Sequence, residues 1–137
     1  MKVILLIMIG LSLLQADFTK TGDIVKDSVS KLEFQDDAIG SRMLWEDAIT
    51  HCEALTLGEH GDWRLPNINE LKSIVDRSKV SPAIVTAFTN TSSSGYCSST
   101  TYEGNKGAAW FVDFSSGRVS SYKGGNFYVR CVRDGQP

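Results

Sequence analysis

The strongest constraint on the fold is a short corner motif at residues 62–67, which reads Asp-Trp-Arg-Leu-Pro-Asn. Trp63 and Leu65 are large apolar side chains, so we expect both to anchor this segment in the core. The proline that follows fixes its own backbone angle and stiffens the approach to the next element. Asp62 and Arg64 are expected to form a charge-assisted pair that closes the corner. The motif therefore indicates a structural turn in preference to a ligand site.

A helix is expected to begin directly after this corner, with Asn67 as its N-cap. The Asn67 side chain can accept a bond from a free backbone N–H, and Glu70 can reach back to complete a capping box. Leu71, Ile74 and Val75 would then form the buried stripe of this helix.

An earlier helix is predicted from apolar residues that recur every three or four positions, with Gly58 as its stop signal. Glu46 and Asp47 would lie in its first turn, where the helix dipole favours negative charge. The residues of the apolar stripe are Trp45, Ala48, Ile49, Cys52 and Leu55.

Strand patterns flank these helices. Residues 24–35 favour a strand, a turn and a second strand, whereas 109–114 and 122–132 favour later strands, the former followed by a Ser-Ser-Gly hairpin turn. In the last run, alternation would carry Cys131 into the core and point Arg130 away from it. We expect the first strand to pair with the last, and the chain to fold as a single α+β domain.

The amino-terminal segment has the plan of a signal peptide. A Met-Lys pair precedes a nearly unbroken apolar run at residues 3–14, and Ala16 offers a small residue for cleavage. The run of about a dozen residues is shorter than the roughly 20 that a membrane-spanning helix needs. We therefore expect removal of residues 1–16, which leaves a domain at 17–137 with no stable membrane span, secreted or periplasmic in a bacterium.

The charge balance argues against a nucleic-acid partner. Loss of Lys2 with the signal peptide would leave 13 of the 14 basic residues against 16 acidic residues, a net charge of −3. A phosphate-binding surface normally shows a basic excess. Four basic residues near the carboxyl end favour a solvated strand face over an anionic-ligand patch: Arg118, Lys123, Arg130 and Arg133.

Catalytic and metal-binding signatures are missing from the sequence. It holds no Gly-x-Ser-x-Gly elbow, phosphate-cradling glycine loop or His-Glu-x-x-His motif, so we predict no catalytic residue and no cofactor. A zinc site from His51 and the three cysteines lacks ligand spacing. Asn90, Asn105 and Asp113 could offer oxygen to calcium, but the Glu-Pro-Asn and Trp-Asn-Asp signatures of calcium-dependent lectins are missing.

Several motifs in sequence order resemble the Lcl C-terminal domain family, named for a bacterial collagen-like adhesin. The resemblance covers roughly residues 24–134, and it departs from the family pattern at Cys97, where Trp is usual, and at 30–34. The matching stretches are Trp45-Glu46-Asp47-Ala48, the 62–67 corner, Pro82-Ala83-Ile84, Tyr96 with Ser98-Ser99-Thr100, Ala109-Trp110, and Tyr128-Val129-Arg130-Cys131-Val132-Arg133.

The resemblance implies a C-type-lectin-like α+β fold, with two helices packed on a small, mainly antiparallel sheet and a long irregular loop region. It also implies an exported, non-catalytic domain that functions in adhesion or glycan binding. Three cysteines in an exported chain suggest one disulfide and one remaining thiol. The family positions imply that Cys52 pairs with Cys131. Cys97 would then be a small buried side chain, and the alternative is an exposed thiol or an intermolecular disulfide.

The ligand surface is expected on residues 89–106 and the adjoining strand. This segment is rich in hydrogen-bonding groups, and aromatic rings can stack on a sugar. A glycan or an envelope or surface protein would be the partner, and Trp110 is a further candidate for which a structural role is favoured. The predicted ligand-binding residues are Tyr96, Tyr102, Asn105, Arg118 and Lys123.

Two alternatives remain open at this point. One is an oxidoreductase related to formylglycine-generating proteins, although that chemistry needs a close pair of active-site cysteines, which Cys97 and Cys131 are not placed to form. The other is a structural or assembly module of the cell envelope without a small ligand.

Export predicts that residues 1–16 are absent from the protein recovered outside the cytoplasm. Intact-mass measurement of the exported protein should give a chain that begins at Asp17. Recovery of the segment from Met1 to Ala16 in membrane fractions would instead indicate a retained anchor.

Overall fold

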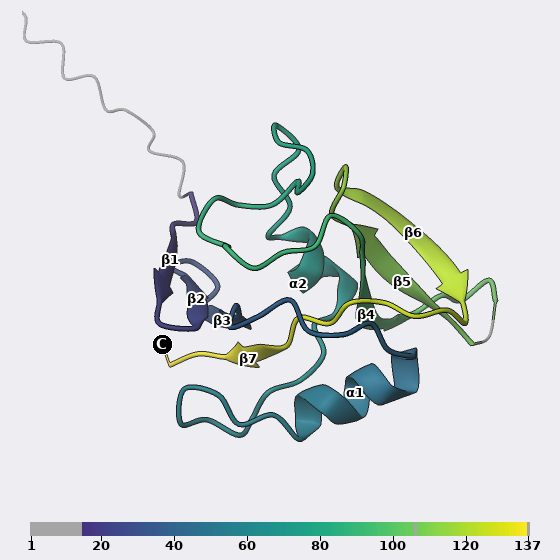
Figure 1. Cartoon of the computed structure of the whole chain (residues 1–137), viewed down its shortest axis with the longest axis horizontal. Coiled ribbons are helices and arrows are strands. Elements are labelled where there is room, and N and C mark those ends of the chain that lie inside the picture. Colours follow the sequence, from purple (N-terminus) through teal and green to yellow (C-terminus); the bar gives the residue numbers. More distant parts are fainter. Residues whose placement is uncertain (1–14, 106, 137) are drawn as a thin grey trace, which may run out of the picture.

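A computed structural model describes residues 15–105 and 107–136 (Figure 1). Residues 1–14 of the predicted signal peptide lie outside the described residues. The strands form two antiparallel sheets where one small sheet was expected. A four-stranded sheet has the order β1-β2-β3-β7, and a three-stranded sheet has the order β4-β5-β6. The elements are β1 (Phe18–Thr21), β2 (Ile24–Asp27), β3 (Leu32–Gln35), α1 (Trp45–Glu53), α2 (Ile68–Lys72), β4 (Gly95–Thr101), β5 (Ala108–Asp113), β6 (Arg118–Lys123) and β7 (Val132–Asp134).

The α+β class is confirmed, and so is the strand-turn-strand at residues 24–35, which forms β2 and β3. The expectation that the first strand pairs with the last was wrong, because β3 pairs with β7, with Phe34 opposite Val132. β2 instead lies between β3 and β1. The β1 strand was missed because Phe18 is its only large apolar residue.

Both predicted helices are present. The α1 helix ends at Glu53, before the predicted stop at Gly58. The α2 capping box is complete, since the Glu70 amide donates to Asn67 Oδ1 at 2.8 Å and the Asn67 amide donates to Glu70 Oε1 at 2.9 Å. The helix is shorter than expected, so Ile74 is buried beyond its end, and Val75 is only partly buried.

The corner between the helices is buried as predicted. The Trp63 side chain is 2% exposed, and its indole N–H donates to the carbonyls of Leu57 and His60. Arg64 joins the corner to β7 through two backbone hydrogen bonds of 2.8 Å with Val132.

The predicted pair between Asp62 and Arg64 was wrong. The Arg64 guanidinium donates to Glu70 at 2.6 and 2.7 Å and to Asp134 at 2.9 Å, while Asp62 accepts from Arg133 at 2.7 Å. The capping box holds the Glu70 carboxylate at the start of α2, where Arg64 reaches it. Glu70 therefore both caps the helix and fixes the corner.

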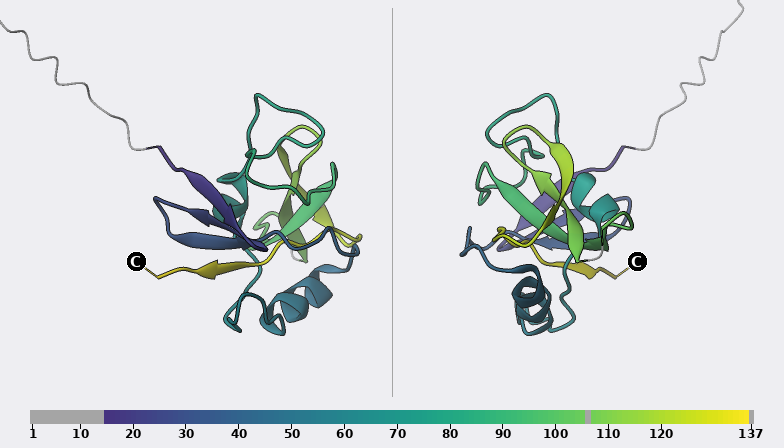
Figure 2. Two further views of the ribbon diagram at one scale, coloured as in Figure 1. Left: turned by 60° about the vertical axis from the view of Figure 1, so that its left-hand side comes forward. Right: turned by 90° about the vertical axis from the view of Figure 1, so that its right-hand side faces the viewer.

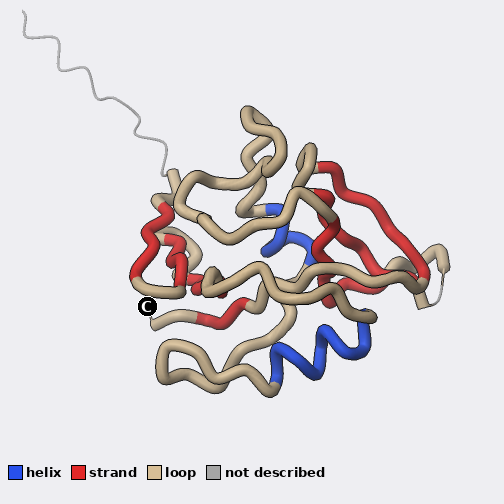
Figure 3. The backbone as a smooth tube through the Cα atoms, in the orientation of Figure 1, coloured by secondary structure: helices blue, strands red, loops and turns tan. Residues whose placement is uncertain are grey.

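Two core clusters divide the interior. The first cluster contains Phe34 of β3, Leu71 of α2 and Val112 of β5, and so joins both sheets. The second cluster contains the α1 side chains Ala48 and Cys52 with the corner residues. Figure 2 shows α1 on the opposite side of the sheets from the connection between α2 and β4, which Figure 3 draws almost entirely as loop.

The predicted disulfide is confirmed. Cys52 of α1 is bonded to Cys131, the residue before β7, with the two Cα atoms 5.4 Å apart. Cys97 is a free, buried cysteine in the same cluster, as expected. The disulfide therefore fixes α1 to the end of the chain from within the second core cluster.

Both ends of the described chain contact the turn between β2 and β3. The Asp17 amide donates to Ser28 Oγ, and the Asp17 carbonyl accepts from the Ser28 amide, both at 2.9 Å. Gly135 lies against the backbone of Lys31, and a Cβ at this glycine would collide with the Lys31 carbonyl oxygen.

Replacement of Trp63 with Ala is expected to destabilise the domain by about 3–5 kcal/mol, because a buried aromatic ring is lost from the core. Tyr122→Ala serves as a control that removes an exposed ring. Thermal and denaturant unfolding of both variants measures the difference. A Trp63→Ala variant that unfolds like the parent would contradict an anchoring role.

Candidate functional site

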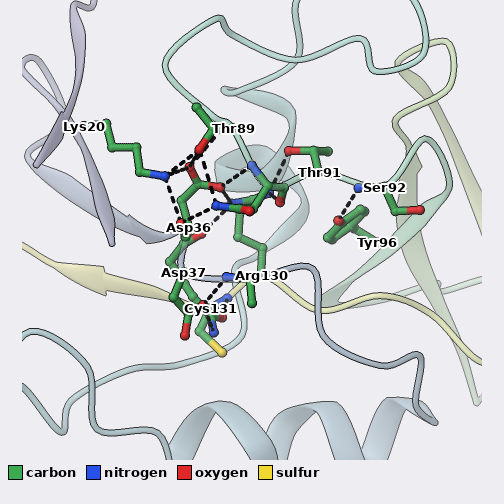
Figure 4. A network of polar contacts seen from close by, with 12 residues as sticks. Lys20, Asp36, Asp37, Thr89, Thr91, Ser92, Tyr96, Arg130 and Cys131 are labelled. Carbon is green, nitrogen blue, oxygen red and sulfur yellow. Dashed lines mark hydrogen bonds and ion pairs between the residues drawn. The ribbon is translucent and has the colours of Figure 1, made fainter. Parts of the chain in front are cut away.

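A buried polar cluster lies between the four-stranded sheet and the loop that precedes β4 (Figure 4). We define it as the Asp36 cluster: Lys20, Asp36, Thr89, Asn90 and Arg130. The Asp36 carboxylate is fully buried and accepts from Lys20 Nζ at 2.8 Å and from the Thr89 amide at 2.9 Å. It also accepts from the Asn90 amide at 3.0 Å and from Arg130 Nη1 at 3.1 Å. The cluster thus joins β1, the end of β3 and the loop.

The expectation that Arg130 points away from the core was wrong, since its residue is 3% exposed. Its guanidinium lies over the Phe88 ring, 4.7 Å from the centroid, and Nη2 donates to the Asn90 carbonyl and Thr91 Oγ1 at 2.8 Å. Strand alternation fails here because residues before Val132 are not part of a regular strand. Arg130 Nε is the one buried side-chain nitrogen or oxygen without a partner among the described residues.

The electrostatics of Asp36 favour its charged form. Burial by itself would raise the pKa of the Asp36 carboxyl, but hydrogen bonds from Lys20 and Thr89 and the positive charge of Arg130 together hold the pKa below its ordinary value. Both oxygens of the buried Asp36 carboxylate accept hydrogen bonds, Oδ1 from Asn90 and Arg130 and Oδ2 from Lys20 and Thr89. The cluster is therefore suited to anchoring the loop rather than to proton transfer.

Tyr96 lies in the interior and not on a ligand surface. Its side chain is 2% exposed, and its hydroxyl accepts from the Ser92 amide at 2.9 Å. Its ring packs edge-on against Phe114, with centroids 5.2 Å apart. Residues 95–101 form β4, so the segment predicted to be irregular from residue 89 to 106 contains a strand. Lys106 lies outside the described residues.

Tyr102 and Asn105 occupy the exposed turn between β4 and β5. The Tyr102 ring is held edge-on to Trp110, with centroids 5.1 Å apart, and the Tyr102 residue is 37% exposed. A Cβ at Gly104 would lie 2.8 Å from this ring, so the glycine leaves room for it. Asn105 is exposed. We call Tyr102, Gly104, Asn105 and Trp110 together the β4–β5 tip.

Arg118 and Lys123, the other two predicted ligand-binding residues, lie at opposite ends of β6. Lys123 pairs with Ala108 beside the β4–β5 tip, whereas Arg118 pairs with Asp113. Five strand steps separate Arg118 from Lys123, a span of about 16 Å. Ala108, the strand partner of Lys123, hydrogen-bonds to the backbones of Tyr102 and Asn105, whereas Arg118 lies at the far end of β6.

An aromatic patch on the three-stranded sheet was missed by sequence reasoning. Phe111, Tyr122 and Phe127 lie together, with centroids 4.9 Å apart for Phe111 and Phe127 and 6.4 Å for Tyr122 and Phe127. Tyr122 is 58% exposed. A Cβ at Gly95 would approach Phe127 to 3.1 Å, so this glycine accommodates the ring. The signal was available, since Phe111 and Tyr122 lie in runs rich in aromatic residues.

The remaining cysteine is not poised for reaction. Burial raises the pKa of the Cys97 thiol to about 12, so the thiolate is scarce at neutral pH. His51 is exposed on α1, while Cys52 is consumed in the disulfide. Within the described ranges, no group of three or more His, Cys, Asp or Glu residues is placed to hold a metal ion.

Comparison with protein families identifies the domain. The model of the Lcl C-terminal domain matches residues 23–133. The chain belongs to the Lcl C-terminal domain family. Comparison with curated proteins and with solved structures gave no significant match. The predicted family is therefore confirmed; it is not a known enzyme family, and membership suggests a non-catalytic extracellular domain.

The Lcl C-terminal domain match spans Asp36, the 62–67 corner, the disulfide and Arg130. The match begins after β1, so Lys20 is the member of the Asp36 cluster that lies outside the matched region. Helices long and apolar enough to cross a membrane are not found in the described part of the chain. The cysteine bridge is typical of an oxidising, non-cytoplasmic compartment.

Asp36→Asn is expected to lower stability at neutral pH by about 3–5 kcal/mol, because Arg130 would lose its buried counter-charge. The folded pKa of Asp36 is depressed, so its contribution is complete above the ordinary pKa of 3.8 and is lost as the pH falls through the lower folded pKa. Unfolding between pH 2 and 7 should show a larger acid-dependent loss in the parent than in Asp36→Asn, which keeps the other carboxyl groups of lowered pKa, such as Glu70. The exposed Asp23→Asn is the control, and an unchanged pH profile for Asp36→Asn would refute the assignment.

Proposed function

We propose that this chain is an exported, non-catalytic binding domain of an adhesin-like or lectin-like kind, whose ligand contacts the β4–β5 tip. The observation that carries the proposal is the arrangement of Tyr102. Its ring is partly exposed, yet it packs edge-on against Trp110 and lies close to the backbone of Gly104. A pre-ordered aromatic ring loses little freedom on binding, which favours ligand contact.

The chemistry around the tip suits a glycan. The exposed Asn105 side chain offers amide hydrogen bonds beside an aromatic face, and sugars present both hydroxyl groups and apolar C–H faces. Lys123 ends the adjacent strand and would favour an acidic ligand. Calcium and other metal cofactors have no part in this proposal.

The oxidoreductase alternative is disfavoured by the cysteines. Cys131 is bonded to Cys52, and the Cys97 thiol is buried with a raised pKa. A pair of reactive cysteines is therefore not available in the described fold.

The assembly-module alternative draws support from the aromatic patch. Tyr122 exposes an aromatic ring next to Phe127, and protein interfaces are enriched in such residues. An envelope or surface protein bound at this patch would make the domain a structural module without a glycan ligand.

Tyr102→Ala and Asn105→Ala are each expected to weaken binding about ten-fold, a loss of about 1.4 kcal/mol. A screen of the exported protein against glycans and envelope proteins, with and without calcium, identifies the ligand. Affinities of the variants are then measured together with their melting temperatures. Tyr122→Ala is the matched control, since it removes an exposed tyrosine outside the tip.

Arg118→Ala should reduce affinity less than the tip variants, because it lies at the far end of β6. Parent-like affinity in all the tip variants would remove the tip from the proposal. A loss confined to Tyr122→Ala would favour the assembly module.

A further inference from the structure

A small hollow lies between the end of α2 and the turn from β5 to β6, at the Arg118 end of β6. Its volume is about 140 Å³, and it is distinct from the β4–β5 tip and from the Asp36 cluster. Segments far apart in the sequence form its walls. The lining residues are Lys72, Val75, Arg77, Gly117 and Val119.

The charged lining of the hollow is entirely positive. Neither Lys72 nor Arg77 takes part in an ion pair or side-chain hydrogen bond with another described residue. Two carboxylates lie close to the lining in sequence and accept from neighbouring serines: Asp76 Oδ1 from the Ser78 amide and hydroxyl, and Asp113 Oδ1 from those of Ser115. The hollow therefore presents two available cations.

The rest of the lining is apolar and consists of two valines and a glycine. Val75 and Val119 supply aliphatic walls. Gly117 has a φ of +83°, and a Cβ there would lie 2.7 Å from Val75 Cγ1 and 3.5 Å from Arg77 Cγ. Glycine at residue 117 therefore allows the positive φ and lets the turn pack closely against Val75 at the edge of the hollow.

We propose that this hollow binds a carboxylate carried on a short aliphatic group, the chemistry of a free peptide carboxyl terminus that ends in a small apolar residue. Lys72 and Arg77 attract the carboxylate, and the arginine fork matches its two oxygens. The valine walls favour a methyl group over hydroxyl groups, which would be left without hydrogen-bond partners. The site does not depend on the function proposed for the β4–β5 tip.

The test uses the exported protein and defined probes. Chemical-shift titration with N-acetyl-alanyl-alanine should show saturable binding with a dissociation constant on the order of 1 mM, centred on Val75 and Val119. The carboxyl-terminal amide of this peptide, sodium sulfate and glucuronate should bind at least ten-fold more weakly. If the amide binds as tightly as N-acetyl-alanyl-alanine, recognition of the carboxylate is overturned. If sulfate or glucuronate binds as tightly as this peptide, the preference for an aliphatic group is overturned.

Variants locate the site. The double substitution Lys72→Gln and Arg77→Gln changes two exposed side chains and should weaken peptide binding at least ten-fold, while Lys26→Gln, on the other sheet, should have no effect. Val119→Phe keeps both charges and should block the space. Tyr102→Ala should leave peptide binding unchanged, which separates this site from the tip. Parent-like affinity in the double variant, at an unchanged melting temperature, would overturn the proposal.

Discussion

The buried ion pair between Asp36 and Arg130 is the interaction on which the arrangement of this domain depends. Arg130 immediately precedes Cys131, and its guanidinium also donates to the Gln35 carbonyl, so one side chain fixes the ends of β3 and β7 beside the disulfide. The same two side chains hold Thr89 and Asn90. Because a buried charge without its partner is costly, these segments form a mutually dependent unit.

This dependence separates the stable framework from the surface proposed for recognition. The Asp36 cluster, the 62–67 corner and the disulfide use their polar and apolar groups on one another, whereas the β4–β5 tip and the aromatic patch leave rings partly exposed. The three-stranded sheet carries both exposed sets, and its β4 strand is anchored in both core clusters through Tyr96 and Cys97. Variation at the exposed rings can therefore alter the proposed binding surface without disturbing the framework.

Features set by neighbouring residues were predictable from the sequence. The Asn67 and Glu70 capping box, the buried Trp63 and the Ser-Ser-Gly turn are specified within a few positions. Burial that depends on partners far away in the sequence could not be predicted in this way. Arg130 looked like a surface residue because its counter-ion lies 94 positions away. Tyr96 looked like a ligand residue because the rings that bury it, Phe114 and Tyr128, come much later in the sequence. Of the candidate site, the sequence correctly indicated the exposed turn at Tyr102 and Asn105, but not its distance from Arg118.

The position of Asp17 and Gly135 on either side of the turn between β2 and β3 has a consequence for protein architecture. Asp17 and Gly135 each contact this one turn, so a short linker could join them without disturbing either sheet. Domains with neighbouring ends tolerate circular permutation and insertion into a loop of another protein. The domain is thus suited to insertion into a loop of a host protein. There it would form an additional protruding domain and displace the host backbone very little.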